Sequence, residues 1–200
     1  MMHLNSESGL VRALEKFRPL CGKRIAMLEA DGLDLERSTT LREAFELAGA
    51  EVVLIADNLE LKRAKDGEGV RADARLRDAA PELFHALCIP GAAAAVEQLR
   101  RAPEACDFVR SFVEGGKWIA TLDHGALLVE DAGLEPGVAL TSNPEIRVEL
   151  EAAGADWVSD AVIADHQLIT ARGDDDFEAF VRVASLSFQE KPSEPPPGYH

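Results

Sequence analysis

The chain has 200 residues, of which 46% are hydrophobic, and its formal net charge is −15 at pH 7. Such a chain is long enough for one domain with a sizeable core, and its acidity disfavours binding to nucleic acid or to an anionic membrane. Because no apolar run reaches membrane-spanning length and no signal peptide is evident, we expect a cytoplasmic protein. Its three cysteines lack metal-ligand spacing, so we expect reduced thiols. The sequence also contains no nucleotide-binding, zinc-protease or dithiol motif, so we expect no metal and no cofactor.

Composition divides the chain into an N-terminal extension (residues 1–22), a folded domain (23–190) and a disordered, proline-rich tail (191–200). Apolar spacing predicts a helix over 10–17 in the extension. Strands are predicted over 24–28, 51–55, 70–74, 86–89, 138–141, 157–158, 162–164 and 168–170, with one more starting at Lys117. Helices are predicted over 40–48, 78–84, 93–101, 103–114, 145–153 and 174–188, and a polar loop over 58–69. This alternation predicts an α/β fold with a mainly parallel sheet.

One stretch, residues 117–128, passes from an apolar run through small residues into a helix-like pattern. A strand that turns sharply into a helix presents one side chain at the top of a sheet, and the turn needs small neighbours two residues away on each side. Thr121 and Gly125 occupy those positions, so the presented residue is Asp123. Aspartate tolerates a positive φ better than most residues do. The sequence therefore predicts a nucleophile elbow that presents a carboxylate.

Three segments follow predicted strands and should meet at one edge of the sheet. They are residues 31–36, residues 90–92 and the pair Asp123-His124. Ligands of parallel α/β sheets bind outside the carboxyl ends of the strands. We therefore expect the three segments to line one pocket.

Several motifs, in this order and at these spacings, resemble the ThiJ/PfpI family. The motifs are Ala30-Asp31-Gly32 and residues 86–91, 116–120, 140–144, 153–158 and 168–173. The family lies within the class I glutamine amidotransferase-like superfamily, and the last three of these motifs most resemble its intracellular protease-like PfpI branch. The resemblance covers residues 23 to 188 and implies a flavodoxin-like three-layer sandwich with helices on both faces of the sheet. It also implies a homo-oligomer, either a dimer or a larger assembly of dimers, and a small carbonyl compound as ligand.

The same resemblance implies a site that departs from the family's pattern. The family's enzymes carry a nucleophilic cysteine at the elbow, where this chain has Asp123, followed by the His124 that the PfpI branch keeps. Asp34 falls where the family has a glutamate that hydrogen-bonds the cysteine. Gly91 and Ala92 match the family's oxyanion segment, and the backbone N–H groups of Ala92 and His124 are the expected donors.

Alternative roles stay open for these residues. Asp123 is either a cap for the following helix, a carboxylate nucleophile or base, or part of a non-catalytic ligand site. His124 is either a general base or acid or a histidine held by neighbouring polar groups. Asp34 is either a partner of Asp123, which would raise the pKa of one carboxyl, or a solvated turn residue. Cys88 and Cys106 are expected to be structural, and helix capping is the simpler explanation for the run Asp174-Asp175-Asp176.

Three functional hypotheses follow. The leading one is a family member that has lost cysteine-based catalysis and acts as a non-catalytic or altered-function protein in a stress response. The second is a hydrolase or lyase, of peptidase, glyoxalase or deglycase type, that uses Asp123 and His124. The third is a regulatory module that binds a small molecule.

Overall fold

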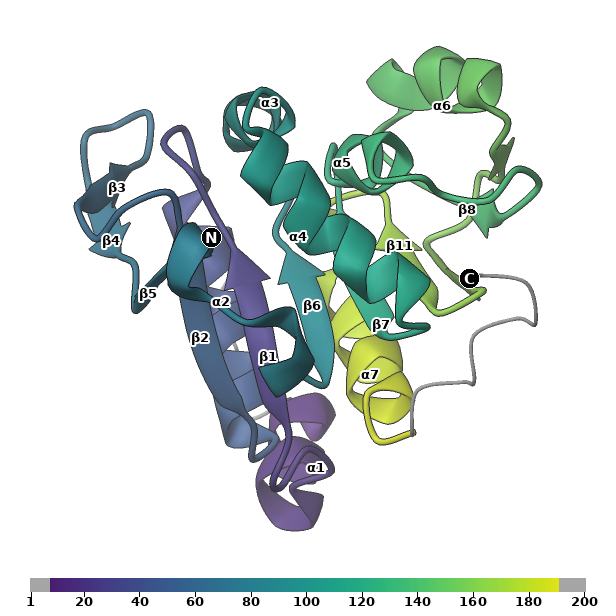
Figure 1. The fold of residues 1–200 in the computed structure, drawn as a ribbon. Coiled ribbons are helices and arrows are strands. Elements are labelled where there is room, and N and C mark those ends of the chain that lie inside the picture. The colour runs from purple at the N-terminus through teal and green to yellow at the C-terminus, as the bar shows by residue number, and fades with distance from the viewer. Residues whose placement is uncertain (1–7, 191–200) are drawn as a thin grey trace.

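The fold is built on a seven-stranded sheet with the order β10-β11-β7-β6-β1-β2-β5 (Figure 1). The structure is a computed structural model that describes residues 8–190, so the expected tail over 191–200 lies outside the described residues. All neighbouring pairs in this sheet are parallel except β10 with β11. The strands are β1 (Arg24–Leu28), β2 (Glu51–Ala56), β5 (Ala74–Arg75), β6 (Ala86–Ile89), β7 (Trp118–Leu122), β10 (Val162–Asp165) and β11 (Leu168–Ala171). The predicted α/β fold with a mainly parallel sheet is therefore confirmed.

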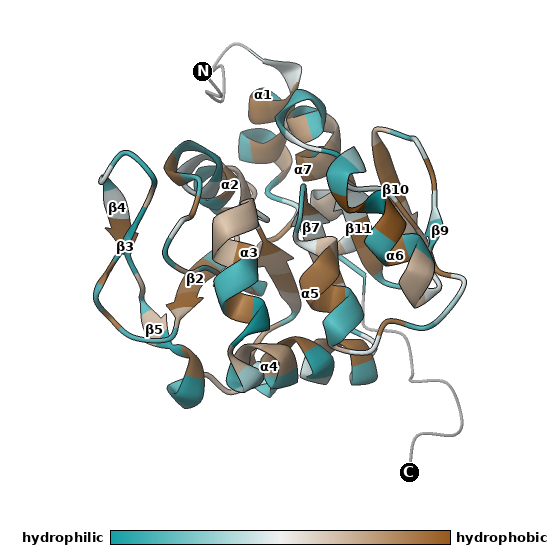
Figure 2. Cartoon of the chain, turned by 90° about the horizontal axis from the view of Figure 1, so that it is seen from above, coloured by the Kyte–Doolittle hydropathy of each residue, from teal (hydrophilic) through white to brown (hydrophobic). Residues whose placement is uncertain are grey.

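Helices cover both faces of the sheet, and its central strands are therefore buried on both sides. One apolar layer lies under α3 (Ala93–Arg100), α4 (Pro103–Glu114) and α5 (Ala126–Asp131). The other layer lies under α1 (Gly9–Phe17), α2 (Leu35–Leu47) and α7 (Phe177–Ser187). Figure 2 shows brown strands between helices that carry both brown and teal residues. Continuous apolar runs such as β6, which is buried throughout, are what a doubly covered parallel sheet requires.

Two small two-stranded sheets lie outside the central one. The pair β3 (Leu61–Arg63) and β4 (Gly69–Arg71) forms an antiparallel hairpin beside the β2 and β5 edge (Figure 1). The pair β8 (Ala139–Leu140) and β9 (Asp156–Trp157) is parallel and lies near α6 (Arg147–Ala153) at the other side of the molecule. Short 3₁₀ turns over residues 76–78, 81–83, 144–146 and 174–176 complete the connections.

Several predicted boundaries are corrected by the structure. Helix α2 begins at Leu35 instead of Thr40, because Asp34 caps it and the polar residues of its first turn face the site. The expected loop over 58–69 contains most of the β3–β4 hairpin, whose polar composition hid it. The edge strand predicted over 70–74 is divided in the structure, because residues 70–71 belong to β4 and only residues 74–75 pair with β2 as β5. The two helices predicted over 145–153 and 174–188 each begin with a 3₁₀ turn in the structure, and the α-helix follows that turn.

No helix among residues 8–190 is both long and apolar enough to cross a membrane. The expected extension over 1–22 includes α1, whose Leu10 and Leu14 are buried against the α2 and α7 layer. Helix α1 is therefore packed onto the domain over its described residues.

Candidate functional site

The predicted elbow is present between β7 and α5. Asp123 has φ of 57°, one of four positive values among the described non-glycine residues. Its backbone N–H donates to Ala171 at 3.0 Å, and its carbonyl accepts from the N–H of Asn143 at 3.1 Å. The turn is thus fastened on both sides by backbone hydrogen bonds, which hold a conformation that costs an ordinary residue about 1 kcal/mol or more.

Two glycines allow the elbow to form. A Cβ atom at Gly125 would lie 1.8 Å from Thr121 Oγ1, so only glycine fits beneath the turn. A Cβ atom at Gly91 would lie 1.8 Å from the carbonyl oxygen of Leu122, and Gly91 also has φ of 84°. The loop after β6 therefore packs directly on the elbow, as the sequence predicted for residues 90–92 and 123–124.

The carboxylate of Asp123 is held by three side chains from three different parts of the chain. Arg37 Nη1 donates to Oδ2 at 3.0 Å, and Asn143 Nδ2 donates to Oδ1 at 2.8 Å. His124 Nδ1 lies 2.8 Å from Oδ1. The prediction that Asp123 caps the next helix is wrong, because α5 has Gly125 at its N-cap position and no side-chain cap. The carboxylate instead points back over the sheet edge, where a guanidinium and an amide lie.

Arg37 is the centre of this cluster, although it was not among the predicted site residues. It is only 5% exposed, and its guanidinium reaches Asp123, Asp174 (Nε to Oδ1, 2.7 Å) and the carbonyl oxygen of Pro90 (3.0 Å). Burial lowers the pKa of Arg37, but the hydrogen bonds and charges of Asp174 and Asp123 outweigh burial and raise it. Arg37 therefore joins the loops after β6, β7 and β11 as a permanent cation.

Asp34 reaches the same region but does not pair with Asp123. Its Oδ1 accepts the backbone N–H of Arg37 at 3.0 Å, so it is the N-cap of α2. Asp34 and Asp123 line one hollow of about 420 Å³, together with Arg37, Ala92 and Lys65. The expected carboxylate pair is thus replaced by Arg37, which neutralises Asp123 while Asp34 starts the helix that carries Arg37. The signal in the sequence was the spacing Asp34-x-x-Arg37, a cap followed by a cation in the first helical turn.

The expected oxyanion donors are only partly available. The backbone N–H of His124 donates to the carbonyl oxygen of Gly91 at 3.0 Å, so this conformation does not offer it to a ligand. Ala92 is the residue before α3 and lines the hollow with Asp123. His124 itself is largely buried, and its Nε2 lies 3.8 Å from Glu145 Oε2.

A second hollow of about 530 Å³ shares Arg37 and Asp123 with the first. Asn143, Arg172 and residues 173–176 form its other walls. The run of three aspartates here does not cap α7, because Asp174 binds Arg37 and Asp176 binds Arg172 at 2.9 Å. These carboxylates position arginines at the site, which the sequence alone did not indicate.

Beneath the site lies a buried acid, Glu29, which was not among the predicted site residues. Glu29 directly follows β1, is 1% exposed and accepts a hydrogen bond from Ser38, the neighbour of Arg37 on α2. Burial raises the pKa of Glu29 to about 8, against smaller opposing effects of Ser38 and Arg37.

The thiols near this site are not activated. Burial and the Glu29 charge raise the pKa of Cys88. Cys88 is therefore an inert buried thiol, as predicted, and Cys106, half-buried with a raised pKa, is no activated thiol either.

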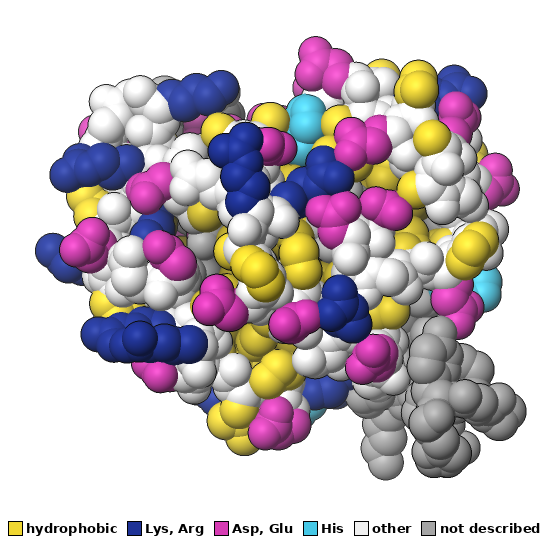
Figure 3. Space-filling model, turned by 45° about the horizontal axis from the view of Figure 1, so that its top comes forward, with side chains coloured by type: hydrophobic (Ala, Val, Ile, Leu, Met, Phe, Trp, Pro, Cys, Tyr) yellow, Lys and Arg dark blue, Asp and Glu magenta, His cyan; other side chains and the backbone are white. Residues whose placement is uncertain are grey.

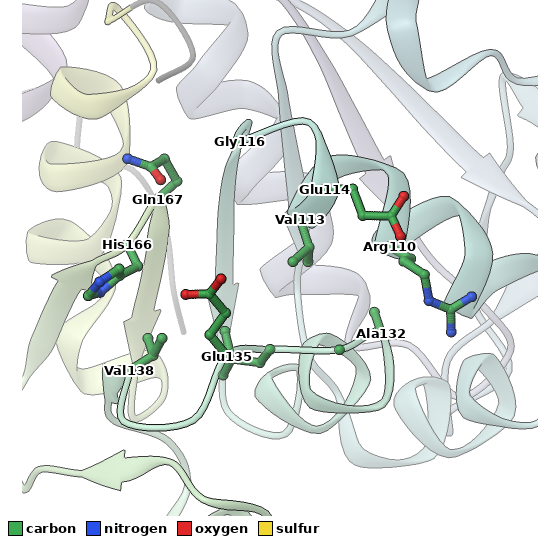
Figure 4. Close-up of a pocket in the computed structure, with 11 residues that line it drawn as sticks. Arg110, Val113, Glu114, Gly116, Ala132, Glu135, Val138, His166 and Gln167 are labelled. Carbon is green, nitrogen blue, oxygen red and sulfur yellow. The ribbon is translucent and has the colours of Figure 1, made fainter. Parts of the chain in front are cut away.

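Another hollow, of about 340 Å³, lies at the opposite edge of the sheet and holds none of the predicted site residues. Figure 4 shows Glu135 extending into it between the His166–Gln167 turn and the end of α4. Among residues 8–190, no group of three or more His, Cys, Asp and Glu side chains is placed to hold a metal ion. The candidate site is therefore the carboxyl edge around Asp123 and Arg37.

Comparisons with known proteins give consistent family and fold matches. The model of the DJ-1/PfpI family matches residues 23–185. General stress protein 18 of Bacillus subtilis is 34% identical over 174 residues, which are 85% of this chain and 99% of that protein. Protein/nucleic acid deglycase 2 of Escherichia coli is 33% identical over 165 residues, 81% of this chain and 95% of that protein. A two-domain Anabaena variabilis protein with DJ-1/ThiJ/PfpI-like and ferritin-like domains superposes with a TM-score of 0.76 at 30% identity, covering 82% of this chain and 47% of that one.

Proposed function

This chain belongs to the DJ-1/PfpI family, and we propose that it serves a stress-related role in the cytoplasm without cysteine chemistry and without covalent catalysis at the elbow. Its family includes proteins named as a stress protein and as deglycases. The observation that carries the proposal is the set of side-chain contacts made by the Asp123 carboxylate. Both of its oxygens are already engaged, one by a buried guanidinium and one by an amide and an imidazole.

A carboxylate nucleophile must direct a lone pair of one oxygen toward the substrate. The ion pair with Arg37 stabilises the Asp123 carboxylate and so makes its oxygen a weaker nucleophile. The His124 N–H, which would stabilise a developing oxyanion, donates to Gly91 instead. The cysteines also favour this view, since Cys88 and Cys106 have raised pKa values. The chain thus has a binding site where the family's enzymes have a reactive thiol, and we propose a small carbonyl compound as its non-covalent ligand.

The direct test is an assay for glyoxalase and deglycase turnover of methylglyoxal, with the Escherichia coli deglycase 2 as positive control. We expect the native chain and an Asp123→Ala variant to be equally inactive. An Asp123→Cys variant should gain measurable turnover, because Arg37 would lower the pKa of the new thiol. Turnover by the native chain that Asp123→Ala abolishes would contradict the proposal.

The second candidate function is a hydrolase in which His124 is the general base. It is favoured by the distance of 2.8 Å between His124 Nδ1 and Asp123, since a carboxylate on one ring nitrogen orients a histidine for proton transfer from the other. The partner Glu145 lies on the Nε2 side at 3.8 Å. This candidate needs no covalent intermediate, because a water molecule would attack the substrate.

Assays with small esters and peptides separate the two candidates. The hydrolase candidate predicts turnover that His124→Gln lowers about a hundredfold. A Glu145→Gln variant is the companion measurement, because it keeps His124 and removes the charge on its open side. No turnover above background in either the native or the His124→Gln protein would support the non-catalytic proposal, whereas equal and measurable rates would contradict both candidates.

A further inference from the structure

One part of this acidic chain is locally basic. Residues 61–77 hold six Lys and Arg against three Asp and Glu, a net charge of +3 in a chain whose total is −15. This segment forms the β3–β4 hairpin, β5 and the turn over residues 76–78. Figure 3 shows dark blue side chains gathered on the left side of the molecule, where these elements lie in Figure 1.

Three arginines of this segment, Arg71, Arg75 and Arg77, line one hollow of about 430 Å³. Most of the protein's arginines are held by carboxylates, as Arg37, Arg42 and others are. Arg71 and Arg75 make no such pair within the described residues, and Arg77 has a single exposed one, 3.8 Å from Asp78. Arg71 and Arg75 therefore line this hollow with no carboxylate of the described residues at ion-pair distance.

The acidic groups of this hollow do not cancel its charge. Asp57 is bound by Lys62, a lysine that is only 2% exposed. Glu60 is the other acid in the lining. With Asp57 paired to Lys62 and Arg77 paired to Asp78, Arg71 and Arg75 meet one further carboxylate, Glu60, so the hollow keeps a net positive charge.

The position of the hollow also fits a ligand site. It lies where β2 ends at Ala56 and where β5, paired with β2 through Ala56 and Arg75, ends beside it. These are carboxyl ends of parallel strands, the edge at which α/β sheets bind ligands. The hollow shares no lining residue with the hollows around Asp123, so it is a separate site.

We propose that Arg71, Arg75 and Arg77 form a second binding site, which takes a small molecule bearing a phosphate chain. Guanidinium groups bind phosphate oxygens through two parallel hydrogen bonds, and a phosphate chain carries enough charge and oxygens to engage three of them at once. The volume suits a di- or triphosphate group with a small organic moiety. The overall charge of −15 repels a long polyanion, so a small ligand is favoured over nucleic acid.

The test is titration calorimetry of the whole chain with tripolyphosphate, inorganic phosphate and citrate. We expect one tripolyphosphate per chain, weaker binding of phosphate and little binding of citrate. An Arg71→Gln/Arg75→Gln variant should bind tripolyphosphate at least about tenfold more weakly. An Arg12→Gln/Arg182→Gln variant is the matched control, because it removes the same charge from exposed helical positions and should bind within about twofold of the native chain.

Equal weakening in both variants would show that net charge alone attracts the anion, and it would overturn the site. Citrate binding as tight as tripolyphosphate would overturn the phosphate chemistry. Tight binding of a short single-stranded oligonucleotide, with tripolyphosphate unbound, would assign the surface to nucleic acid and also contradict the proposal. Circular dichroism of both variants checks that each is folded.

Discussion

At the scale of single residues, Arg37 decides the character of the site, because it turns a buried carboxylate into half of an ion pair. Its side chain is 7% exposed and that of Asp123 is 14% exposed, so neither charge is well solvated. Removing one partner of such a pair leaves the other charge buried and uncompensated. Arg37 also draws Asp174 and the Pro90 carbonyl to the same place, which makes it a structural cross-link as well.

We therefore expect Arg37→Met to lower the free energy of unfolding by about 3 kcal/mol. Arg42→Met is the control, since Arg42 lies on the same helix and also meets two carboxylates but is far more exposed, and we expect a loss of about 1 kcal/mol or less. Urea unfolding followed by circular dichroism measures both. Adding Asp123→Asn to Arg37→Met should recover part of the loss, and equal losses for Arg37→Met and Arg42→Met would contradict this account.

Glu29 gives a second prediction at this scale, which concerns pH. Burial raises its pKa to about 8 from an ordinary value of 4.5. Between these values the unfolded chain has released the proton that the native protein still holds, so stability falls as pH rises. The loss is at most about 1.4 kcal/mol per pH unit across this window and ends above pH 8.

The Glu29→Gln variant cannot ionise, so its unfolding free energy should be flatter between pH 5 and pH 8 than that of the native chain. Glu43→Gln, at an exposed position of α2, should keep the native slope. Denaturation curves at a series of pH values measure the difference. If the native chain and Glu29→Gln have parallel profiles, Glu29 is not the group that titrates.

At the scale of elements, the elbow between β7 and α5 depends on close backbone approach. Gly125 has φ of −63°, so its need for glycine comes from space and not from backbone conformation. The obstacles are Thr121 Oγ1 at 1.8 Å and Ile89 Cγ2 at 3.1 Å from a Cβ atom placed there. Both neighbours belong to buried central strands and cannot move away without disturbing the sheet.

Gly125→Ala should therefore cost about 1–3 kcal/mol of stability. Gly9→Ala is the matched control, because a Cβ atom at Gly9 meets nothing within 4 Å and lies in helix α1. That control should be neutral or slightly stabilising. Thermal unfolding compares the two, and a Gly125→Ala protein as stable as the native chain would show that the elbow is looser than its geometry implies.

At the scale of the whole molecule, the positions of the thiols predict their reactivity. Cys88 lies inside the sheet, Cys106 is half-buried and Cys21 is exposed. With iodoacetamide near pH 7, mass spectrometry should find Cys88 unmodified until the chain is unfolded, because burial raises its pKa and blocks the reagent. Cys106 should react slowly, because burial raises its pKa and partly shields it from the reagent, though less than for Cys88. Rapid, stoichiometric labelling of either residue in the native protein would reveal an active thiol.

Assembly is the other prediction at this scale. We propose that the chain forms a homo-oligomer, a dimer or a larger assembly of dimers, on the strength of its resemblance to the PfpI branch of the family. Light scattering at micromolar concentration should give a multiple of the 21.6 kDa chain mass. A monomer at every concentration up to about 100 µM, a range in which stable dimers persist, would remove this proposal.

The sequence by itself determined the layered fold and the elbow that carries the candidate site. Apolar runs such as 86–89 and the glycine at 125 leave few alternatives, since buried strands and tight turns restrict residue type locally. Only the tertiary structure decided which charges meet. Arg37, Asp123 and Asp174 are far apart in the chain, and their pairing arises because three parallel strands end at one edge. Local patterns carry backbone preferences over a few residues, whereas the partner of a buried charge depends on the packing of the whole sheet.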